Sequence, residues 1–596
     1  MQLLVTEKPS VASAICNALG ISDGTKHDGY IEGKDIIATW CKGHLVEMAD
    51  PESYDLTYKK WSCDTLPIIP AKWKYRIKQA TKKQYSIVKS LMKRDDIDSI
   101  CNCCDAGREG ELIFRLVYQE AGCDKPVKRL WISSMEEGAI KYGMEHLLSA
   151  DHYDSLYAAA LCRAKADWLI GMNGTRLFSC IYKGKVKKVG RVQTPTLAMI
   201  VKREAEIKGF KKTMYYVAEL QKDGLIIKSD RFTTKDEAEE ALKRCEGKPI
   251  TVTGVAKKEI RTAPPKLFDL TTLQREANKV FGFTAKQTLD YLQSLYEKKL
   301  VTYPRTDSRF LTEDMASSAA NMENLIKGIT GWGDENPDIK QILDSKKVSD
   351  HHAVIPTPEI ARAKMDEIPD AERKILELVM LRVAEATSTE SVSVKIDIAL
   401  DCAGIIFHTT MEDQVKEGFK AYTAKFKEKY AKNAKTGKAP GCMKDQLSCA
   451  GSVLPSGWEG SVKEDPTKPP AYYTESTLLS AMEKAGADET AKDAERRGLG
   501  TPATRADIIE KLVHDGYVKR IGKKIQATED GIKLISYLPD RIKSPSYTAE
   551  WENRLAEIAK GETSAHVFME CIETEVKQMV AEYSTKDTGA EKGAAV

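Results

Sequence analysis

The chain has 596 residues, of which 42% are hydrophobic and 30% are charged, and its formal net charge is +3. This length exceeds what one hydrophobic core usually supports, so we expect several domains. No stretch approaches the ~18 uninterrupted apolar residues of a membrane span. Residues 1–7 acquire a charge too early for a signal peptide, and the fourteen cysteines are scattered, so we expect a cytoplasmic protein with reduced thiols.

The first 150 residues alternate apolar strands with helices, which indicates an α/β domain. A strand is expected at 2–6, and the helix after it begins near Pro9 and ends near Gly20. A second strand at 97–104 leads into a helix that begins at Arg108.

The rest of the chain changes type several times. In order, we expect helices over 151–209, strands over 214–260, helices over 270–388, a strand at 392–400, a Lys- and Gly-rich stretch to about 465, helices over 470–583 and a frayed tail at 584–596. Strands separated by more than a hundred helical residues can still share one sheet. The helical segment at 270–388 is then an insertion between them.

Carboxylates follow both predicted strands of the first domain. Glu7 ends the first strand, and Asp105 and Glu109 follow the second. Ligands of open α/β sheets bind beyond the carboxyl ends of the strands, and converging hard oxygens suit Mg²⁺. The alternative is that the acidic residues near Arg108 only stabilise the N-terminus of a helix by interacting with the positive end of its dipole.

Tyr303 is the candidate nucleophile. A predicted amphipathic helix leads to it, and Pro304 favours an extended backbone at Tyr303. A tyrosine can attack a phosphodiester when a nearby cation such as Arg305 favours the phenolate and neutralises the transition state. A single tyrosine near an arginine is more often structural, so the pair alone leaves both interpretations open.

Residues 72–94 contain nine Lys or Arg residues and no acid, with Trp73, Tyr75 and Tyr85 among them. Such a mixture suits phosphate contact together with base stacking on single-stranded nucleic acid. The alternative, which the sequence supports equally well, is that these charges form the solvated face of a helix.

Six short motifs, in this order, resemble those of the type IA DNA topoisomerases. They lie at residues 7–10, 105–111, 190–196, 303–308, 351–357 and 500–505, and the resemblance extends over about residues 1 to 570. In its lack of zinc ribbons the chain is more similar to the topoisomerase III branch than to the bacterial topoisomerase I branch.

The resemblance implies a mixed α/β multidomain fold that closes into a toroid around DNA. It implies a TOPRIM domain at 1–150, a helical DNA-binding domain made of 151–213 and 466–583, a β-rich arch made of 214–268 and 389–465, and a helical domain at 269–388 that carries the tyrosine. It also implies a monomer that acts without ATP on single-stranded regions of negatively supercoiled or catenated DNA, and it leaves a helicase partner open.

Roles for individual residues follow from the same resemblance. Tyr303 is the nucleophile that forms a 5′-phosphotyrosine, Arg305 and Lys8 contact the scissile phosphate, and His351 lies beside them. Glu7 takes part in proton transfer or in metal binding. The implied Mg²⁺ ligands are Glu7, Asp105 and Glu109, and the implied single-strand groove contains Arg191, Gln193 and Thr194.

One position departs from the family pattern. Gly107 stands where the family usually has a second aspartate, so the number and affinity of bound ions are open. Two other functions remain alternatives. One is a TOPRIM nuclease or primase, which needs Glu7, Asp105 and Glu109 but not Tyr303. The other is a non-catalytic relative that only binds single-stranded DNA.

Overall fold

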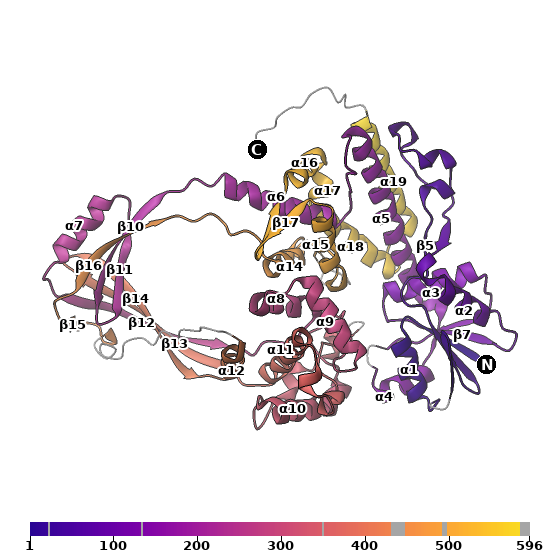
Figure 1. Cartoon of the computed structure of the whole chain (residues 1–596), viewed down its shortest axis with the longest axis horizontal. Helices are drawn as coiled ribbons and strands as arrows, with labels where there is room; N and C mark the ends of the chain where they lie inside the picture. The colour runs from indigo at the N-terminus through magenta and orange to yellow at the C-terminus, as the bar shows by residue number, and fades with distance from the viewer. Residues whose placement is uncertain (22–23, 133–134, 349–350, 431–446, 491–497, 585–596) are drawn as a thin grey trace.

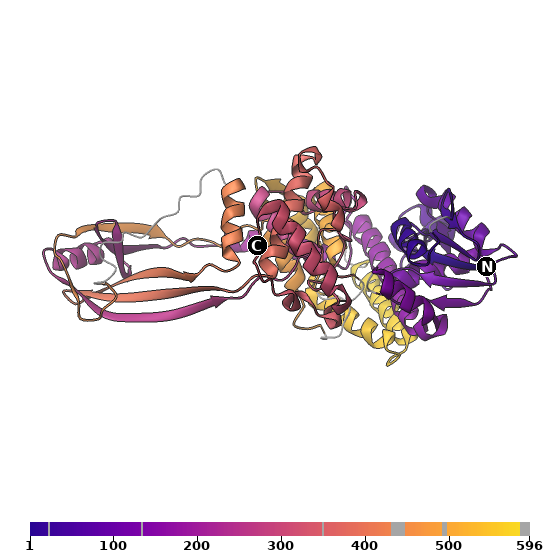
Figure 2. The same ribbon diagram turned by 90° about the horizontal axis from the view of Figure 1, so that it is seen from below.

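The computed structural model describes residues 1–21, 24–132, 135–348, 351–430, 447–490 and 498–584. The predicted tail from 585 onward and residues 431–446 of the Lys- and Gly-rich stretch lie outside this description. Figure 1 shows an N-terminal α/β domain, two helical bodies and a sheet that stands away from them, so that the chain closes into a ring. Figure 2 shows from below how far this sheet extends from the helices.

The N-terminal domain is built on a largely parallel sheet. Its strands lie in the order β2-β3-β4-β1-β7-β8-β9, with β1 parallel to β4 and to β7. The strands are β1 (Gln2–Thr6), β2 (Thr25–His27), β3 (Tyr30–Glu32), β4 (Ile36–Trp40), β7 (Ser99–Cys103), β8 (Val127–Arg129) and β9 (Leu148–Ser149). A separate pair is formed by β5 (Val46–Met48) and β6 (Tyr75–Ile77).

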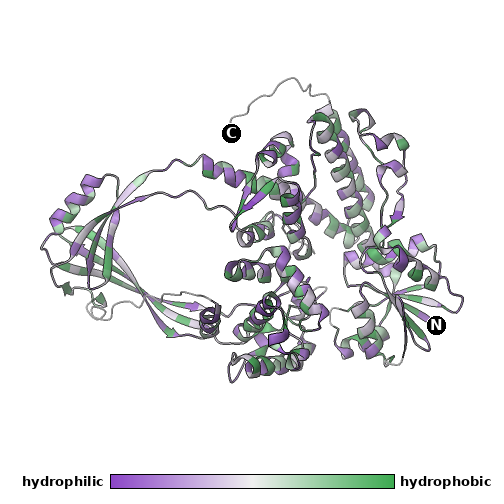
Figure 3. Ribbon diagram, in the orientation of Figure 1, coloured by the Kyte–Doolittle hydropathy of each residue, from purple (hydrophilic) through white to green (hydrophobic). Residues whose placement is uncertain are grey.

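Both faces of β1 are buried, which explains its unbroken apolar sequence. Leu4 packs with α1 (Pro9–Ala18) and α4 (Glu137–Glu145) on one face. Leu3 and Val5 pack with α2 (Lys82–Met92) and α3 (Arg108–Ala121) on the other. In Figure 3 the hydrophobic colour accordingly runs through the strands of this sheet.

A helical body joins segments from both halves of the sequence. Its long helices α5 (Asp154–Ile181) and α6 (Gln193–Lys208) come from the first half. The others are α14 (Glu475–Lys484), α15 (Pro502–His514), α16 (Glu529–Tyr537), α17 (Asp540–Lys543), α18 (Pro545–Ala559) and α19 (Ala565–Ser584). A hairpin of β17 (Val518–Ile521) and β18 (Lys524–Ala527) interrupts the region expected to be helical, with Gly522 in its turn at φ 57°.

The second sheet, here called the arch, unites strands that are far apart in the sequence. Its order is β15-β12-β13-β14-β11-β10-β16. The strands are β10 (Met214–Lys222), β11 (Leu225–Phe232), β12 (Ile250–Thr262), β13 (Ser391–Cys402), β14 (Ile405–Lys416), β15 (Val453–Leu454) and β16 (Glu459–Pro466). β12 and β13 pair antiparallel from Thr251↔Asp401 to Thr262↔Ser391, on either side of the inserted helices.

Two helices lie in stretches that were expected to be β-rich. α7 (Lys235–Cys245) begins at a capping box in which Thr234 and Glu237 bond reciprocally, and it packs on the arch sheet. α12 (Lys420–Tyr430) packs on the inserted helices, and its Tyr430 hydroxyl donates to Glu377 at 2.6 Å. The prediction for α7 overlooked the capping box, which is the local signal for a helix start.

The inserted helices form the tyrosine domain around one core. They are α8 (Leu270–Phe281), α9 (Ala285–Glu297), α10 (Ala316–Thr330) and α11 (Asp370–Ala386). No helix in the described ranges is long and apolar enough to cross a membrane. Every cysteine in the described part of the chain is a free thiol.

Candidate active site

Three turns of the N-terminal domain meet at one edge of its sheet. Glu7 follows β1 and Asp105 follows β7, and these strands are parallel neighbours. His44 follows β4 through a turn in which Lys42 and Gly43 have φ of 54° and 74°. The carboxyl ends of parallel strands therefore bring together residues that are far apart in the sequence.

The tyrosine loop is held by the segment that contains His351. The Thr302 amide donates to the Ile355 carbonyl at 2.9 Å, and the Thr306 hydroxyl donates to the His351 carbonyl at 2.8 Å. The two sequence motifs at 303–308 and 351–357 thus form one structural unit, which fixes Tyr303 beside His351.

Five of the predicted site residues meet across the two domains. The Lys8 Nζ pairs with the Asp105 carboxylate and lies 3.8 Å from the centroid of the Tyr303 ring. The His351 Nε2 is 3.0 Å from the Asp105 Oδ2, and its ring centroid is 4.3 Å from that of Tyr303. The Glu7 carboxylate is 3.6 Å from the Lys8 Nζ.

The charges in this cluster shift the pKa values of its carboxyl groups in opposite directions. Burial alone would raise the pKa of Asp105, but Lys8 and His351 outweigh it and hold the pKa well below its usual range. Burial, together with the neighbouring Asp105, raises the pKa of Glu7 to about 7. Glu7 can therefore hold or release a proton near neutral pH.

Tyr303 is a neutral phenol at neutral pH. Burial raises its pKa, and Lys8 only partly offsets this effect. Attack on a phosphodiester therefore requires that its proton leave as the bond to phosphorus forms, with a cation to stabilise the charge. Lys8 already lies over the ring, and Arg305 is exposed on the same cleft.

Glu109 does not join Glu7 and Asp105. Its carboxylate is 2.7 Å from the His44 Nε2 and 3.6 Å from Arg163. Burial would raise its pKa, but these partners outweigh burial and lower the pKa to about 2. Within the described residues, no group of three or more His, Cys, Asp or Glu is arranged to hold a metal ion. Glu109 as a metal ligand stays a prediction.

The Glu7–Asp105 pair nevertheless fits a cation. The Asp105 Oδ1 is buried and has no hydrogen-bond partner in the part of the chain that the structure describes, while the Oδ2 is bound by Lys8 and His351. A buried carboxylate oxygen without a donor is a costly state that an ion can relieve. Burial is the main cause of the raised pKa of Glu7, and the negative charge of Asp105 adds to it.

A cleft of about 970 Å³ opens between the two domains at this cluster. Its lining includes Glu7, Lys8, Tyr303, Arg305 and His351. Its volume is within the range of ligand sites.

The motif at 190–196 lies in the helical body and is largely internal. Arg191 is buried, and it donates to Asp167 at 2.8 Å and to Glu552 at 3.2 Å. Thr194 is also buried, and its hydroxyl accepts from the Gly190 amide. Gln193 begins α6, and its side-chain amide lies 3.5 Å from a carboxylate oxygen of Asp515. The DNA contacts of Arg191, Gln193 and Thr194 stay a prediction.

The basic stretch at 72–94 is not one uniform surface. Arg76 pairs with Glu47 and Asp50, and Arg94 pairs with Glu32 and Asp96. These cations are committed to carboxylates of their own domain. Lys72 and Lys82 are exposed and remain candidates for contact with phosphates.

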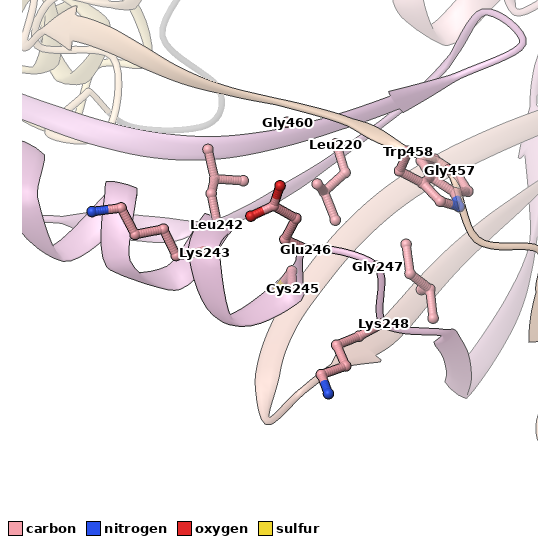
Figure 4. A pocket seen from close by; sticks show the side chains of 11 residues that line it. Leu220, Leu242, Lys243, Cys245, Glu246, Gly247, Lys248, Gly457, Trp458 and Gly460 are labelled. Atoms are coloured by element: carbon pink, nitrogen blue, oxygen red, sulfur yellow. The ribbon is translucent and has the colours of Figure 1, made fainter.

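A smaller cavity of about 290 Å³ lies in the arch. Figure 4 shows its walls, where Leu220, Leu242 and Trp458 surround the end of α7. Its described lining includes none of the residues predicted for catalysis or metal binding.

The sequence-based prediction of the site missed His44, Arg163 and a contact between Ser10 and Tyr296. His44 could have been suspected because it follows a buried strand, as Glu7 does. Arg163 lies in the interior of a long helix, and Tyr296 lies near the end of another. Nothing local in the sequence distinguishes either from a packing residue.

The sequence is similar to proteins of one known family. Residues 151–570 match the family model described as DNA topoisomerase, and residues 2–135 match the Toprim domain. The DNA topoisomerase 3 of Bacillus cereus is 38% identical over 98% of this chain and 82% of its own length. That of Bacillus subtilis is 37% identical over 97% of this chain and 81% of its own.

Among solved structures, full-length topoisomerase I from Thermotoga maritima shares the fold, with a TM-score of 0.71 at 21% identity. The match covers 98% of this chain and 91% of that one. The family resemblance expected from the six sequence motifs is confirmed over nearly the whole chain. The chain belongs to the type IA DNA topoisomerases and, within them, to the DNA topoisomerase 3 family.

Proposed function

We propose that Tyr303 is the residue with which this ATP-independent type IA topoisomerase cuts one strand of DNA. The observation that carries the proposal is the position of Tyr303 at a cleft between two domains, with the Lys8 ammonium over its ring. The Tyr303 oxygen gives its proton to water as it attacks phosphorus, the bond to the 3′ oxygen breaks, and a 5′-phosphotyrosine conserves the energy of that bond. Another strand passes through the gap, and the reverse reaction reseals the ends.

The neighbouring side chains have different roles in this reaction. Lys8 and Arg305 neutralise charge on the phosphate, because a cation in a site shielded from water stabilises developing negative charge strongly. Glu7, with a pKa of about 7, donates a proton to the departing 3′ oxygen and takes it back during resealing. His351 holds the Asp105 carboxylate in place beside Lys8.

Magnesium is the proposed cofactor, and Glu7 and Asp105 are the residues that would hold it. When bound, the ion would neutralise their crowded charge and that of the DNA phosphate. Single-stranded regions of supercoiled or catenated DNA are the proposed substrates. A cytoplasmic monomer associated with the nucleoid fits these substrates, and a helicase partner would supply the single-stranded regions.

An adduct assay separates this function from its rivals. A 5′-labelled and a 3′-labelled single-stranded oligonucleotide are each incubated with the protein and run on a denaturing gel. We expect the protein to retain the 3′-labelled fragment, because the tyrosine bonds to the 5′ phosphate. A nuclease would cut without an adduct, and a binding protein would do neither. Relaxation of supercoiled DNA with magnesium and without ATP completes the test.

The pKa of Glu7 predicts how cleavage depends on pH. Glu7 is protonated below about pH 7, so the general acid is lost as the pH rises through this value. Single-turnover adduct formation, measured without magnesium so that Glu7 carries only its own proton, should therefore fall on the alkaline side between about pH 6 and 9 in the wild type. In Glu7→Gln the rate should be lower, and this fall at high pH, the alkaline limb of the profile, should be absent. An unchanged limb in Glu7→Gln would assign the titration to another group.

Gly107 allows a test of the metal site. Its φ is −172°, so the backbone accepts a side chain there, whereas a Cβ on Gly110 would collide with the Asp105 carbonyl oxygen. Gly107→Asp adds a carboxylate near Asp105, so the magnesium needed for half-maximal relaxation should fall several-fold. The matched control is Gly107→Asn, which adds nearly the same shape without the charge. An equal magnesium requirement in both variants would show that position 107 does not face the ion.

A further inference from the structure

Tyr296 contacts the proposed nucleophile with its ring. It lies near the end of α9, partly buried against the core of the tyrosine domain. Its ring meets Tyr303 edge to face, with centroids 5.6 Å apart and an interplanar angle of 77°. This is a preferred geometry for an aromatic pair, and it restricts the orientation of both rings.

The other end of Tyr296 reaches the opposite domain. Its hydroxyl is 2.7 Å from the Ser10 hydroxyl, on the second residue of α1. Both side chains line the cleft that contains Tyr303. The contact therefore joins the tyrosine domain to the N-terminal domain across the face that must separate for strand passage.

This contact differs in kind from the other contacts described across the cleft. Lys8 over Tyr303 and His351 on Asp105 use residues of the proposed catalytic and metal site, and both involve charge. The hydrogen bond between Ser10 and Tyr296 is neutral and involves none of those groups. It can hold the domains together while the charged groups are engaged with a phosphate.

We infer that Tyr296 is a positioning residue with two separable parts. Its ring orients Tyr303 for attack, and its hydroxyl ties the closed gate to Ser10, where the gate is the face between the N-terminal and tyrosine domains. This inference rests on the proposed role of Tyr303. Neither part takes a proton or touches the reacting phosphate.

The ring is tested by three side chains at position 296. Tyr296→Leu should slow single-turnover adduct formation about three- to tenfold, because an aromatic pair is lost. Its affinity for single-stranded DNA and its melting temperature should stay close to those of the wild type. Tyr296→Phe should rescue the rate, since this part needs only the ring. Wild-type cleavage by Tyr296→Leu, or failure of Phe to rescue it, overturns the assignment.

The hydroxyl is tested by gate opening on a cleaved strand held under force in magnetic tweezers. Ser10→Ala and Tyr296→Phe should each raise the ratio of open to closed states about fivefold, the effect of one hydrogen bond. The double variant should show no further increase, because both changes remove the same bond. Additive effects of the two substitutions, or an unchanged ratio of open to closed states, would show that the hydrogen bond between Ser10 and Tyr296 does not hold the gate closed. If the wild type forms no adduct at all, the proposed function fails instead, so the two failures are distinguishable.

Discussion

Tyr303→Phe is expected to abolish the covalent adduct and all relaxation while leaving the affinity for single-stranded DNA nearly unchanged. The change removes one oxygen and keeps the ring, so the packing on Tyr296 and the position under Lys8 are retained. Without that oxygen no bond to phosphorus can form at this position. The loss should therefore reach the detection limit of a labelled-oligonucleotide assay.

Two measurements make this result specific to the nucleophile. The melting temperature of the variant should match the wild type, because the ring that fills the site is kept. Tyr291→Phe is the matched control, since it removes the same atom from a tyrosine of α9, the helix that precedes Tyr303, and Tyr291 lies outside the described lining of the cleft. Adduct formation by Tyr303→Phe would move the nucleophile to another residue.

The acidic edge of the N-terminal sheet was predictable because it depends on a topological rule. Glu7 and Asp105 each follow a buried apolar strand, and parallel strands place such residues together without further information. The pairing of β12 with β13 around the inserted helices was predictable for a similar reason, since strand patterns stand on both sides of them. In both cases the signal is local hydrophobic periodicity.

The orientation of individual charged side chains was not predictable in this way. Glu109 opens the same helix that follows Asp105, yet its carboxylate turns to His44 and Arg163 from other elements. Arg191 has the sequence context of a phosphate ligand, but Asp167 and Glu552 engage it in the interior. Side-chain direction at such positions is decided by charges that come together only when the domains fold.

Lys8→Met is expected to lower the rate of adduct formation by about 10²- to 10³-fold, the usual effect of removing a charged group that stabilises a transition state. The Lys8 ammonium pairs with Asp105, lies 3.6 Å from Glu7 and lies over the Tyr303 ring. Methionine keeps most of the apolar stem but removes the charge. The attacking phenol then loses the cation that lies over its ring, and the phosphate loses one of its two proposed cations.

The same change has a second consequence that a merely weakened site would not show. Lys8 lowers the pKa of Glu7 below the value that burial and Asp105 would give, so its removal should raise that pKa further. The alkaline limb of the cleavage profile should therefore move to higher pH in Lys8→Met. Lys42→Met is the control, because Lys42 lines the same cleft and is exposed, and it should change the rate less than about threefold. A rate in Lys8→Met equal to that of Lys42→Met, with the limb unmoved, would remove Lys8 from the chemistry.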